Sequence, residues 1–387
     1  MNISFENTKI AFSDKSKKEL IKAFWLFKTV ESPLVVRIGE KLLKFALFVK
    51  FPVKWIIKPT IFSHFCGGET MEECKQTITR LSKSNIKTIL DYSAEGIKNE
   101  SSFDNVKRQI IEIIELAKNE INIPFAVFKV TGIARFDLLE KVSNKSKLNT
   151  SEFEEFERVK NRIDEICAKG FENDIPILID AEESWIQDAI DEIVDEMMIK
   201  YNRNKAIVYN TIQLYRTDRL DFLTKKIEFA RKNNFYLGFK LVRGAYMEKE
   251  RERALKYNYV SPIHVDKKAT DEAFNKALIL CIDNIDVVSI CNGSHNEYSN
   301  LLMVKLINER KLEPGDKRLF FAQLLGMSDH ISYNLANAGY NVAKYVPFGP
   351  VKTVIPYLIR RAKENTSIAG QSGRELLLIK KELKMRK

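Results

Sequence analysis

The chain has 387 residues, of which 45% are hydrophobic and 30% charged, and a formal net charge of +11. This composition excludes a disordered or collagen-like chain, and the length fits either two or three domains or one large barrel with an extension. Five cysteines without a CxxC pair exclude a disulfide framework and favour a reducing compartment. The first residues lack an apolar signal core, so secretion is not expected.

The positive charge is concentrated at the start of the chain. Residues 1–60 hold twelve Lys/Arg and five Asp/Glu, and no uncharged apolar run reaches the roughly 20 residues of a membrane-spanning helix. Two interpretations fit this segment: helices that lie on an anionic membrane surface, or an amphipathic arm that packs on the chain's own core. Basic residues at one end do not predict a nucleic-acid groove. Large apolar residues alternate with these cations: Phe24, Trp25, Phe27, Leu42, Leu43, Phe45, Leu47, Phe48, Trp55, Ile56 and Ile57.

From about residue 70 onward, short runs rich in β-branched and aromatic residues alternate with longer stretches of helical period. Eight such runs are nearly continuous apolar segments, which is typical of strands in a parallel sheet covered by helices. The predicted strands are 86–92, 124–130, 175–181, 206–211, 236–242, 286–291, 318–322 and 342–346. The predicted helices are 103–120, 152–170, 184–201, 217–233, 269–284, 297–310, 328–339 and 351–364.

Eight consecutive strand–helix units predict an α/β protein with a closed (β/α)8 TIM-type barrel and an N-terminal helical arm. An open doubly wound sheet is the alternative, but the GxGxxG sequence that usually follows its first strand is absent. We assign residues 1–69 to the arm and residues 70–387 to the barrel with its C-terminal helix. Residues 131–151 are long for a strand–helix loop, and we expect them to cover the barrel mouth or to be partly mobile.

Polar residues cluster at the predicted carboxyl ends of the strands, where barrels of this kind carry their chemistry. Any one of them is more often structural than functional, but nearly all eight strands end this way. The set comprises Asp91, Glu95, Lys129, Asp180, Glu182, Glu183, Gln213, Tyr215, Lys240, Arg243, Gly244, Tyr246, His295, Asn296 and Tyr345.

Several common chemistries fit this set poorly. The four histidines show no HxH or HExxH spacing, so no metal site is expected. Mg²⁺ at Asp180 and Glu182 is disfavoured because Lys129 and Lys240 would point into the same space. No GxSxG elbow is present for a serine nucleophile. Schiff-base chemistry on one of the two lysines remains possible.

The last predicted barrel helix carries Tyr357, Arg360, Arg361 and Glu364 at i, i+3, i+4 and i+7, which places them on one face. A solvated charged face is one interpretation. The other is a carboxylate-binding site, because arginine binds carboxylates with two parallel hydrogen bonds and keeps its charge. Glu364 would then orient one guanidinium.

Three segments resemble the proline dehydrogenase family: GFKLVRGAY from Gly238 to Tyr246, FAQLLGM from Phe321 to Met327, and the region from Tyr345 to Asn365 with its string YLIRRAKEN. The segment Ile179–Glu183 fits as well. The resemblance covers roughly residues 60–380 and is greatest with the stand-alone enzymes, because the chain is too short for the bifunctional form.

The resemblance implies an FAD-dependent barrel that oxidises L-proline to Δ1-pyrroline-5-carboxylate by hydride transfer to N5 of FAD. Electrons would pass to quinone, with the protein peripheral on the inner face of the cytoplasmic membrane, or mitochondrial in a eukaryote.

The resemblance also implies roles for individual residues at the substrate. Arg360, Arg361 and Lys129 would bind the proline carboxylate. Tyr345 would pack on the substrate ring with Leu324 and Tyr357 nearby. Asp180 would link Tyr345 to the arginines, and Glu95 would pair with Arg360 as a gate.

A second implied group binds FAD. Gln213 and Lys240 would contact the isoalloxazine, with Lys240 close to N5. Residues along the phosphates and the adenosine would be Arg243, Gly244, Ala245 and His295, and we include Tyr246 and Asn296 in the cofactor site.

Two other functions stay open at this point. One is a lyase or aldolase barrel with a Schiff-base lysine at Lys129 or Lys240. The other is a non-enzymatic basic module that binds membranes or nucleic acid.

Overall fold

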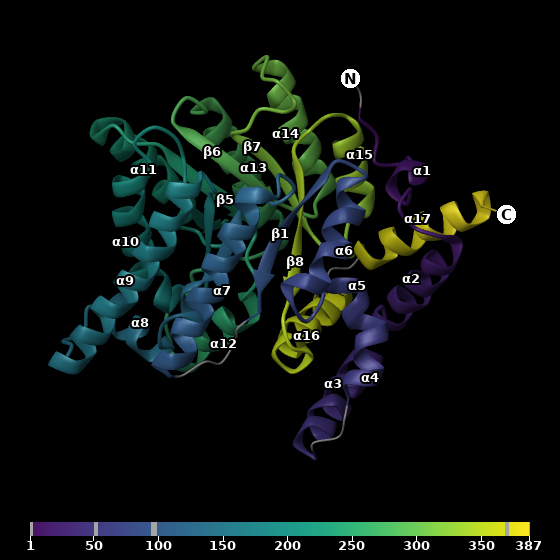
Figure 1. Cartoon of the computed structure of the whole chain (residues 1–387), viewed down its shortest axis with the longest axis horizontal. Helices are drawn as coiled ribbons and strands as arrows, with labels where there is room; N and C mark the ends of the chain where they lie inside the picture. Colours follow the sequence, from purple (N-terminus) through teal and green to yellow (C-terminus); the bar gives the residue numbers. More distant parts are fainter. Residues whose placement is uncertain (1–2, 50–52, 94–98, 368–370, 387) are drawn as a thin grey trace. The chain divides into compact units, whose positions relative to one another are not determined.

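The computed structural model describes residues 3–49, 53–93, 99–367 and 371–386. Eight parallel strands form a closed barrel in sequence order (Figure 1). The predicted (β/α)8 barrel is therefore confirmed, and an open sheet is excluded. The strands are β1 Ile86–Tyr92, β2 Ala126–Lys129, β3 Ile177–Asp180, β4 Val208–Gln213, β5 Leu237–Val242, β6 Val288–Gly293, β7 Leu319–Leu324 and β8 Val342–Phe348.

The strands are buried because their side chains face either the barrel interior or the surrounding helices. All residues of β4 and β8 are buried, including polar ones, as expected for a parallel sheet covered on both faces. β1 pairs with β8 in register from Ile86 opposite Val342 to Tyr92 opposite Phe348. This register brings the carboxyl ends of the first and last strands level with each other.

The helices that follow the strands begin at side-chain caps in several places. Asn99, Asn149 and Asp266 each accept a hydrogen bond from the backbone N–H three residues later. Each expected helix is present within a few residues of its predicted ends. These helices are α7 Glu100–Asn119, α9 Thr150–Asn173, α10 Ser184–Tyr201, α11 Arg219–Asn233, α13 Lys267–Asp283, α14 Glu297–Glu309, α15 Asp329–Asn337 and α16 Val351–Ser367.

Two segments differ from the sequence-based prediction. Residues 131–151, expected to be a long loop, contain most of the 3₁₀ turn η2 Val130–Gly132 and the helix α8 Phe136–Ser143, whose Leu138 and Leu139 are fully buried. A further helix, α12 Met247–Tyr257, follows β5 and was not predicted. It is strongly charged, and only Glu250 and Ala254 are buried, so it shows little apolar periodicity.

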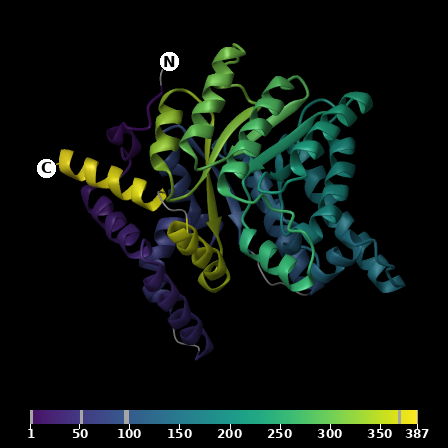
Figure 2. The ribbon, with the colours of Figure 1, turned by 180° about the vertical axis from the view of Figure 1, so that it is seen from behind.

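The N-terminal region is helical, as predicted, and the final segment also forms a helix. Within this region α2 packs beside α17 (Figure 2). Buried residues of α1, α2 and α17, among them Phe12, Phe27 and Ile379, form one apolar cluster. In the part of the chain described here, no helix is long and apolar enough to cross a bilayer. The elements are α1 Thr8–Ala11, α2 Lys17–Val30, α3 Pro33–Phe48, α4 Lys54–Ile57, η1 Lys58–Phe62, α5 Ser63–Phe65, α6 Met71–Ser82 and α17 Gln371–Met385.

The chain divides into two compact units. One comprises Met1–Glu95 and Gln323–Lys387, and therefore holds the arm, β1, β8, α15, α16 and α17. The other is Gly96–Ala322, which holds β2 to β6 and most of β7. The candidate site residues fall in both units, and each group is described within its own unit.

Candidate active site

In the unit Gly96–Ala322, a lysine and an aspartate from different strands form a buried ion pair. Lys240 lies on β5 and is 5% exposed, and its Nζ donates a hydrogen bond to Oδ1 of Asp180 at the end of β3. Each charge compensates the other in a region with little water, which makes the pair a fixed element of the barrel. The structure thus brings together two residues that the sequence assigned to separate roles.

Lys129 ends β2 and is the direct strand neighbour of Asp180. Next to it, the buried carboxylate of Glu182 accepts hydrogen bonds from the backbone N–H of Thr131, at 3.0 Å, and from the Thr131 hydroxyl. Burial raises the pKa of Glu182 to about 7, and the positive charge of Lys129 acts in the opposite direction. Glu182 therefore ties the segment after β2 to the segment after β3 and interacts electrostatically with Lys129.

Gln213 ends β4 and is 2% exposed. Its Oε1 atom is buried and accepts no hydrogen bond from any residue that the structure describes. A buried amide oxygen without a donor costs about 1–3 kcal/mol, so such an atom at the carboxyl end of a barrel strand indicates a place where a ligand donates.

Arg243 follows β5, and four side chains hold its guanidinium. Nε donates to Asp271 at 2.6 Å, and the two terminal nitrogens donate to the hydroxyls of Ser294 and Ser299, each at 2.9 Å. Its Cζ lies 4.4 Å from the ring centroid of Phe274. Burial lowers the pKa of Arg243, and the hydrogen bond and negative charge of Asp271 partly offset this shift. The cation is thus held rigidly at the end of β5.

Gly244 adopts φ +129°, and a Cβ atom at this position would overlap the ring of Tyr215. Only glycine combines this backbone conformation with such a close approach. The neighbouring strand end is fixed by Tyr215, whose backbone N–H donates to the carbonyl of Arg243 at 2.7 Å. Ala245 is exposed and Tyr246 is half-buried, so the backbone after Gly244 is accessible to a ligand.

His295 and Asn296 follow β6 and are both partly exposed. The Asn296 side chain accepts a hydrogen bond from the backbone N–H of Ser299 at 3.0 Å and so caps α14. Asn296 therefore has a structural function, and its assignment to the cofactor site stays a prediction.

In the other unit, α16 carries the arginine pair. Arg361 is 7% exposed, and its Cζ lies 5.3 Å from the ring centroid of Tyr357, which is equally buried. Arg360 is half-buried. Val354 and Leu358, seven and three residues before Arg361 and on the same side of α16, pack with Tyr357 in one apolar cluster. The guanidinium of Arg361 consequently does not point into bulk water, which excludes the interpretation of this face as simply solvated.

β8 and the end of β7 supply the remaining residues of this unit. Tyr345 on β8 is 8% exposed, and its carbonyl accepts a hydrogen bond from the backbone N–H of Leu325 at 2.8 Å. This bond places the half-buried Leu324, at the end of β7, level with Tyr345 on β8. Gly326 follows with φ +75°, and a side chain there would also overlap the backbone of His64, so both the conformation and the close approach favour glycine.

Two predicted residues are not placed. Glu95 lies outside the described residues, and the side chain of Glu364 is not described, although its backbone belongs to α16. The gate between Glu95 and Arg360, and the orientation of a guanidinium by Glu364, therefore stay predictions.

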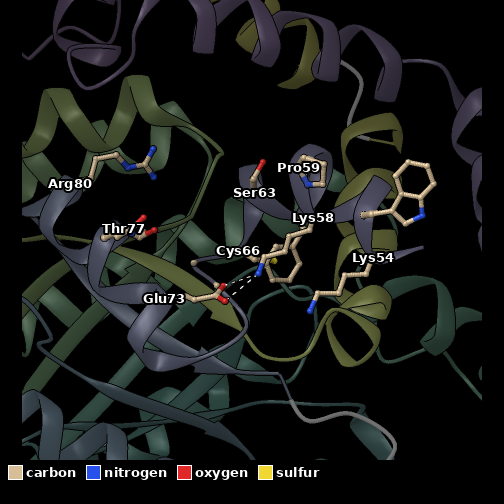
Figure 3. Close-up of a pocket in the computed structure, with 13 residues that line it drawn as sticks. Lys54, Lys58, Pro59, Ser63, Cys66, Glu73, Thr77 and Arg80 are labelled. Atoms are coloured by element: carbon tan, nitrogen blue, oxygen red, sulfur yellow. Dashed lines mark hydrogen bonds and ion pairs between the residues drawn. The ribbon is translucent and has the colours of Figure 1, made fainter. Parts of the chain in front are cut away.

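A cavity of about 860 Å³ lies in the same unit (Figure 3). It is lined by residues of α4, η1, α5 and α6, and Figure 3 shows Lys58 directed toward Glu73, with Nζ 3.1 Å from Oε1. None of the predicted site residues lines it. The cavity thus belongs to the N-terminal region and not to the candidate active site.

Sequence reasoning missed the residues that hold the site in place. Asp271, Ser294 and Ser299 around Arg243 lie on three later segments, so no local pattern could have identified them. Glu182, two residues after Asp180, is among the polar residues that the sequence places at a strand end, but the sequence did not indicate that Thr131 is its partner.

The chain is similar to several known proteins. The model of the family described as proline dehydrogenase matches residues 74–374. The chain is 34% identical to proline dehydrogenase 1, mitochondrial, of Dictyostelium discoideum, over 98% of this chain and 74% of that protein. It is 32% identical to the carbapenem antibiotics biosynthesis protein CarD of Pectobacterium carotovorum subsp. carotovorum, over 83% of each.

Among solved structures, proline utilization A from Bdellovibrio bacteriovorus has the same fold, with a TM-score of 0.72 at 20% identity. The match covers 93% of this chain and 38% of that longer protein. The matched residues include all eight strands from β1 to β8 and the arginine pair of α16. The chain belongs to the proline dehydrogenase family.

Proposed function

We propose that the chain oxidises L-proline to Δ1-pyrroline-5-carboxylate with FAD as its cofactor. The observation that carries the proposal is the burial of Arg361 against Tyr357 on the helix that follows β8, in a chain of this family. A permanently charged guanidinium held beside an aromatic ring can bind the carboxylate of a small amino acid with paired hydrogen bonds.

In this proposal Arg360, Arg361 and Lys129 bind the proline carboxylate. The arginines form paired hydrogen bonds, and the lysine adds a point charge. Holding the carboxylate at one end of a five-membered ring fixes the direction of the opposite carbon, from which the hydride leaves. Tyr345, Leu324 and Tyr357 enclose the ring and exclude water, since all three are buried or half-buried.

The residues at the ends of β4 and β5 fit FAD. The Oε1 of Gln213 needs a donor, which a flavin ring N–H provides, and Gly244 lets the backbone come close to a pyrophosphate. The fixed charge of Arg243 suits the same phosphates. When bound, FAD supplies the hydride acceptor. Lys240, held by Asp180, offers positive charge to the flavin ring.

The remaining assignments complete the proposed site. Ala245, Tyr246, His295 and Asn296 would line the cofactor, and Glu95 and Glu364 would act on the arginines. The amine of proline must lose its proton before hydride leaves, and solvent can take that proton.

We further propose that quinone accepts the electrons and that residues 1–69 form an arm that brings the barrel to the membrane. The protein would then be peripheral on the inner face of the cytoplasmic membrane, or mitochondrial in a eukaryote. The excess of positive charge in residues 1–60 supports this placement.

The deciding experiment is the absorbance spectrum of the purified chain before and after anaerobic addition of proline. A yellow protein that loses its visible absorbance with proline is expected. A colourless protein that borohydride and a carbonyl substrate modify at Lys129 or Lys240 would instead establish the Schiff-base alternative.

Substitution of Arg361 distinguishes the proposed enzyme from the alternative of a non-enzymatic module. The Arg361→Ala protein should still bind flavin, but proline should no longer bleach its visible absorbance. If the variant bleaches at the same proline concentrations as the wild type, Arg361 does not bind the substrate.

A further inference from the structure

Helix α12, which begins just after Gly244 and Tyr246 at the end of β5, is held almost entirely by polar contacts. Of its eleven residues, only Glu250 and Ala254 are buried. A helix in a folded protein is stabilised mainly by burial of an apolar face, as α10 is in the same unit. Because α12 buries so little apolar surface, its position depends on its polar side chains.

The main contact of α12 is made by the carboxylate of Glu250, which has no exposed surface. Its Oε1 accepts a hydrogen bond from the backbone N–H of Ser184, and its Oε2 accepts one from the Ser184 hydroxyl, both at 2.6 Å. Ser184 is the first residue of α10, whose N-cap residue, Glu183, makes no side-chain capping bond. Glu250 therefore caps α10 from another helix, and the positive end of the α10 dipole favours its charge.

Two more charged side chains hold α12 in place. Lys249 lies 2.6 Å from the carboxylate of Glu183, measured from Nζ to Oε1. Arg253 places its Cζ 4.5 Å from the ring centroid of Trp185 and donates a hydrogen bond to Glu140 of α8, which lies close to α12 in Figure 1. Through these contacts α12 reaches from the end of β5 to the segment that follows β3.

The surroundings of Glu250 also lower the cost of moving α12 away. In the part of the chain that the structure describes, no lysine or arginine forms an ion pair with Glu250, whose partner is Ser184. Burial of a carboxylate without a cation is unfavourable, and water solvates this carboxylate once α12 has moved. Elements that bury few apolar groups open at free energies well below that of global unfolding.

The start of α12 belongs to the segment at which we place the cofactor. Tyr246 is the N-cap residue of α12, and Nζ of Lys249 lies 5.2 Å from the centroid of its ring. Two residues earlier, Gly244 lies tightly against the ring of Tyr215. Since close packing fixes Gly244 whereas polar contacts hold α12, the short segment between them is the place where the chain bends if α12 moves.

We propose that α12 is a mobile cover of the FAD site and that Glu250 is its latch. In the closed position Glu250 joins α12 to α10, and the cofactor is retained. When the two hydrogen bonds to Ser184 break, α12 moves away and FAD enters or leaves. The proposal rests on the proposed function, because it takes residues 244–246 as part of the FAD site. Glu250 is a positioning residue, since it acts on the cofactor only through α12.

Hydrogen exchange of the flavin-loaded chain, followed by mass spectrometry, tests whether α12 opens. The amides of residues 247–257 should exchange at least about 100-fold faster than those of α10 and α13, because α12 opens locally while the barrel stays folded. Removal of FAD should accelerate this exchange further, since a cofactor that is held by the closed form opposes opening. Equal protection of α12 and the two reference helices would overturn the cover.

Two variants test the latch through the rate at which FAD leaves the chain. Glu250→Ala removes the carboxylate, and Ser184→Pro removes both donors but leaves α10 intact, because proline is well tolerated at the first residue of a helix. Each variant should release FAD at least about tenfold faster than the wild type after dilution, with free flavin measured by rapid filtration. The matched control is Glu252→Ala, which removes an exposed glutamate of the same helix. Unchanged release in both latch variants would overturn the assignment of Glu250.

Proline-dependent reduction of a soluble dye at saturating FAD distinguishes the latch from the proposed chemistry. Both latch variants should retain this activity, because neither Glu250 nor Ser184 is among the proposed site residues. Loss of activity in a variant that still holds flavin would overturn the role of Glu250 as a latch. A wild-type chain without flavin would contradict the proposed function, whereas a yellow, active chain in which α12 is fully protected would contradict only the cover.

Discussion

The Nζ atom of Lys344 lies 2.9 Å from Oδ1 of Asp329, and the lysine side chain has no exposed surface. The same nitrogen donates a hydrogen bond to the carbonyl of Met327 at 2.5 Å. Lys344 immediately precedes Tyr345 on β8, whereas Met327 lies in the turn that follows Leu324. A second cation, Lys15, contacts Asp329 at 2.5 Å, and the two positive charges keep the pKa of this carboxyl below its ordinary value. The cluster holds the turn after β7 against β8.

Lys344→Met should destabilise the protein strongly, because it leaves the buried Asp329 with one cation fewer. Removing one partner of a buried ion pair typically costs about 3–5 kcal/mol. Denaturant unfolding of the variant and of the wild type measures the difference. The control is Lys352→Met, which removes an exposed lysine and should cost less than about 0.5 kcal/mol. Equal stability of the two variants would show that the cluster is not stabilising.

The barrel could be predicted because each strand is a short apolar run followed by a helix of clear period. The strand ends were harder to predict. β4 and β6 each continue two residues beyond the prediction, to Gln213 and Gly293. Gln213 at the end of β4, and Asn292 and Gly293 at the end of β6, interrupt the apolar runs from which the strands were predicted. The helix α8 was not predicted because it has only eight residues, and Gly132 and Arg135 interrupt the apolar pattern just before it.

Arg361→Lys should raise the KM for proline by about 10- to 150-fold and leave the flavin bound. Lysine keeps the charge but loses the paired hydrogen bonds to a carboxylate, which corresponds to about 1.5–3 kcal/mol. Steady-state kinetics with a soluble acceptor measures the change. Arg231→Lys, on an exposed arginine paired with Asp286, is the matched control and should have no effect. A normal KM in Arg361→Lys would refute the carboxylate assignment.

Gly244→Ala should lower the amount of FAD that copurifies with the chain. The new methyl group would overlap the ring of Tyr215, and φ +129° is unfavourable for alanine, so the backbone at the end of β5 has to move. The ratio of absorbance at 450 nm to that at 280 nm reports the bound flavin. Gly339→Ala is the control, because Gly339 also has positive φ, +87°, but has open space around it. Full flavin content in Gly244→Ala would argue against a cofactor contact there.

The site could be predicted only in part from the sequence. The arginine pair on α16 and Lys240 on β5 could be predicted as site residues, because spacing along a helix and position in a strand are local properties of the sequence. The partners of these residues were not found, since they come from distant segments. Arg243 is held by Asp271, Ser294 and Ser299, and these contacts depend on how α13 and α14 pack. Asp180 was expected to interact with Tyr345 and the arginines, and its pairing with Lys240 was not foreseen.

Glu182→Gln should change how stability depends on pH. The carboxyl of Glu182 has a pKa of about 7 in the folded chain and an ordinary value of 4.5, so between these values the folded state holds a proton that the unfolded state has lost. Stability from this group is therefore fully present below pH 4.5 and is lost as the pH rises through 7, by roughly 3 kcal/mol in total. Glutamine is neutral at every pH and can still accept the hydrogen bond from the N–H of Thr131. Unfolding free energies at pH 5 and pH 8 should consequently differ less in the variant than in the wild type, and an identical difference in both proteins would show that Glu182 stays ionised in the folded chain.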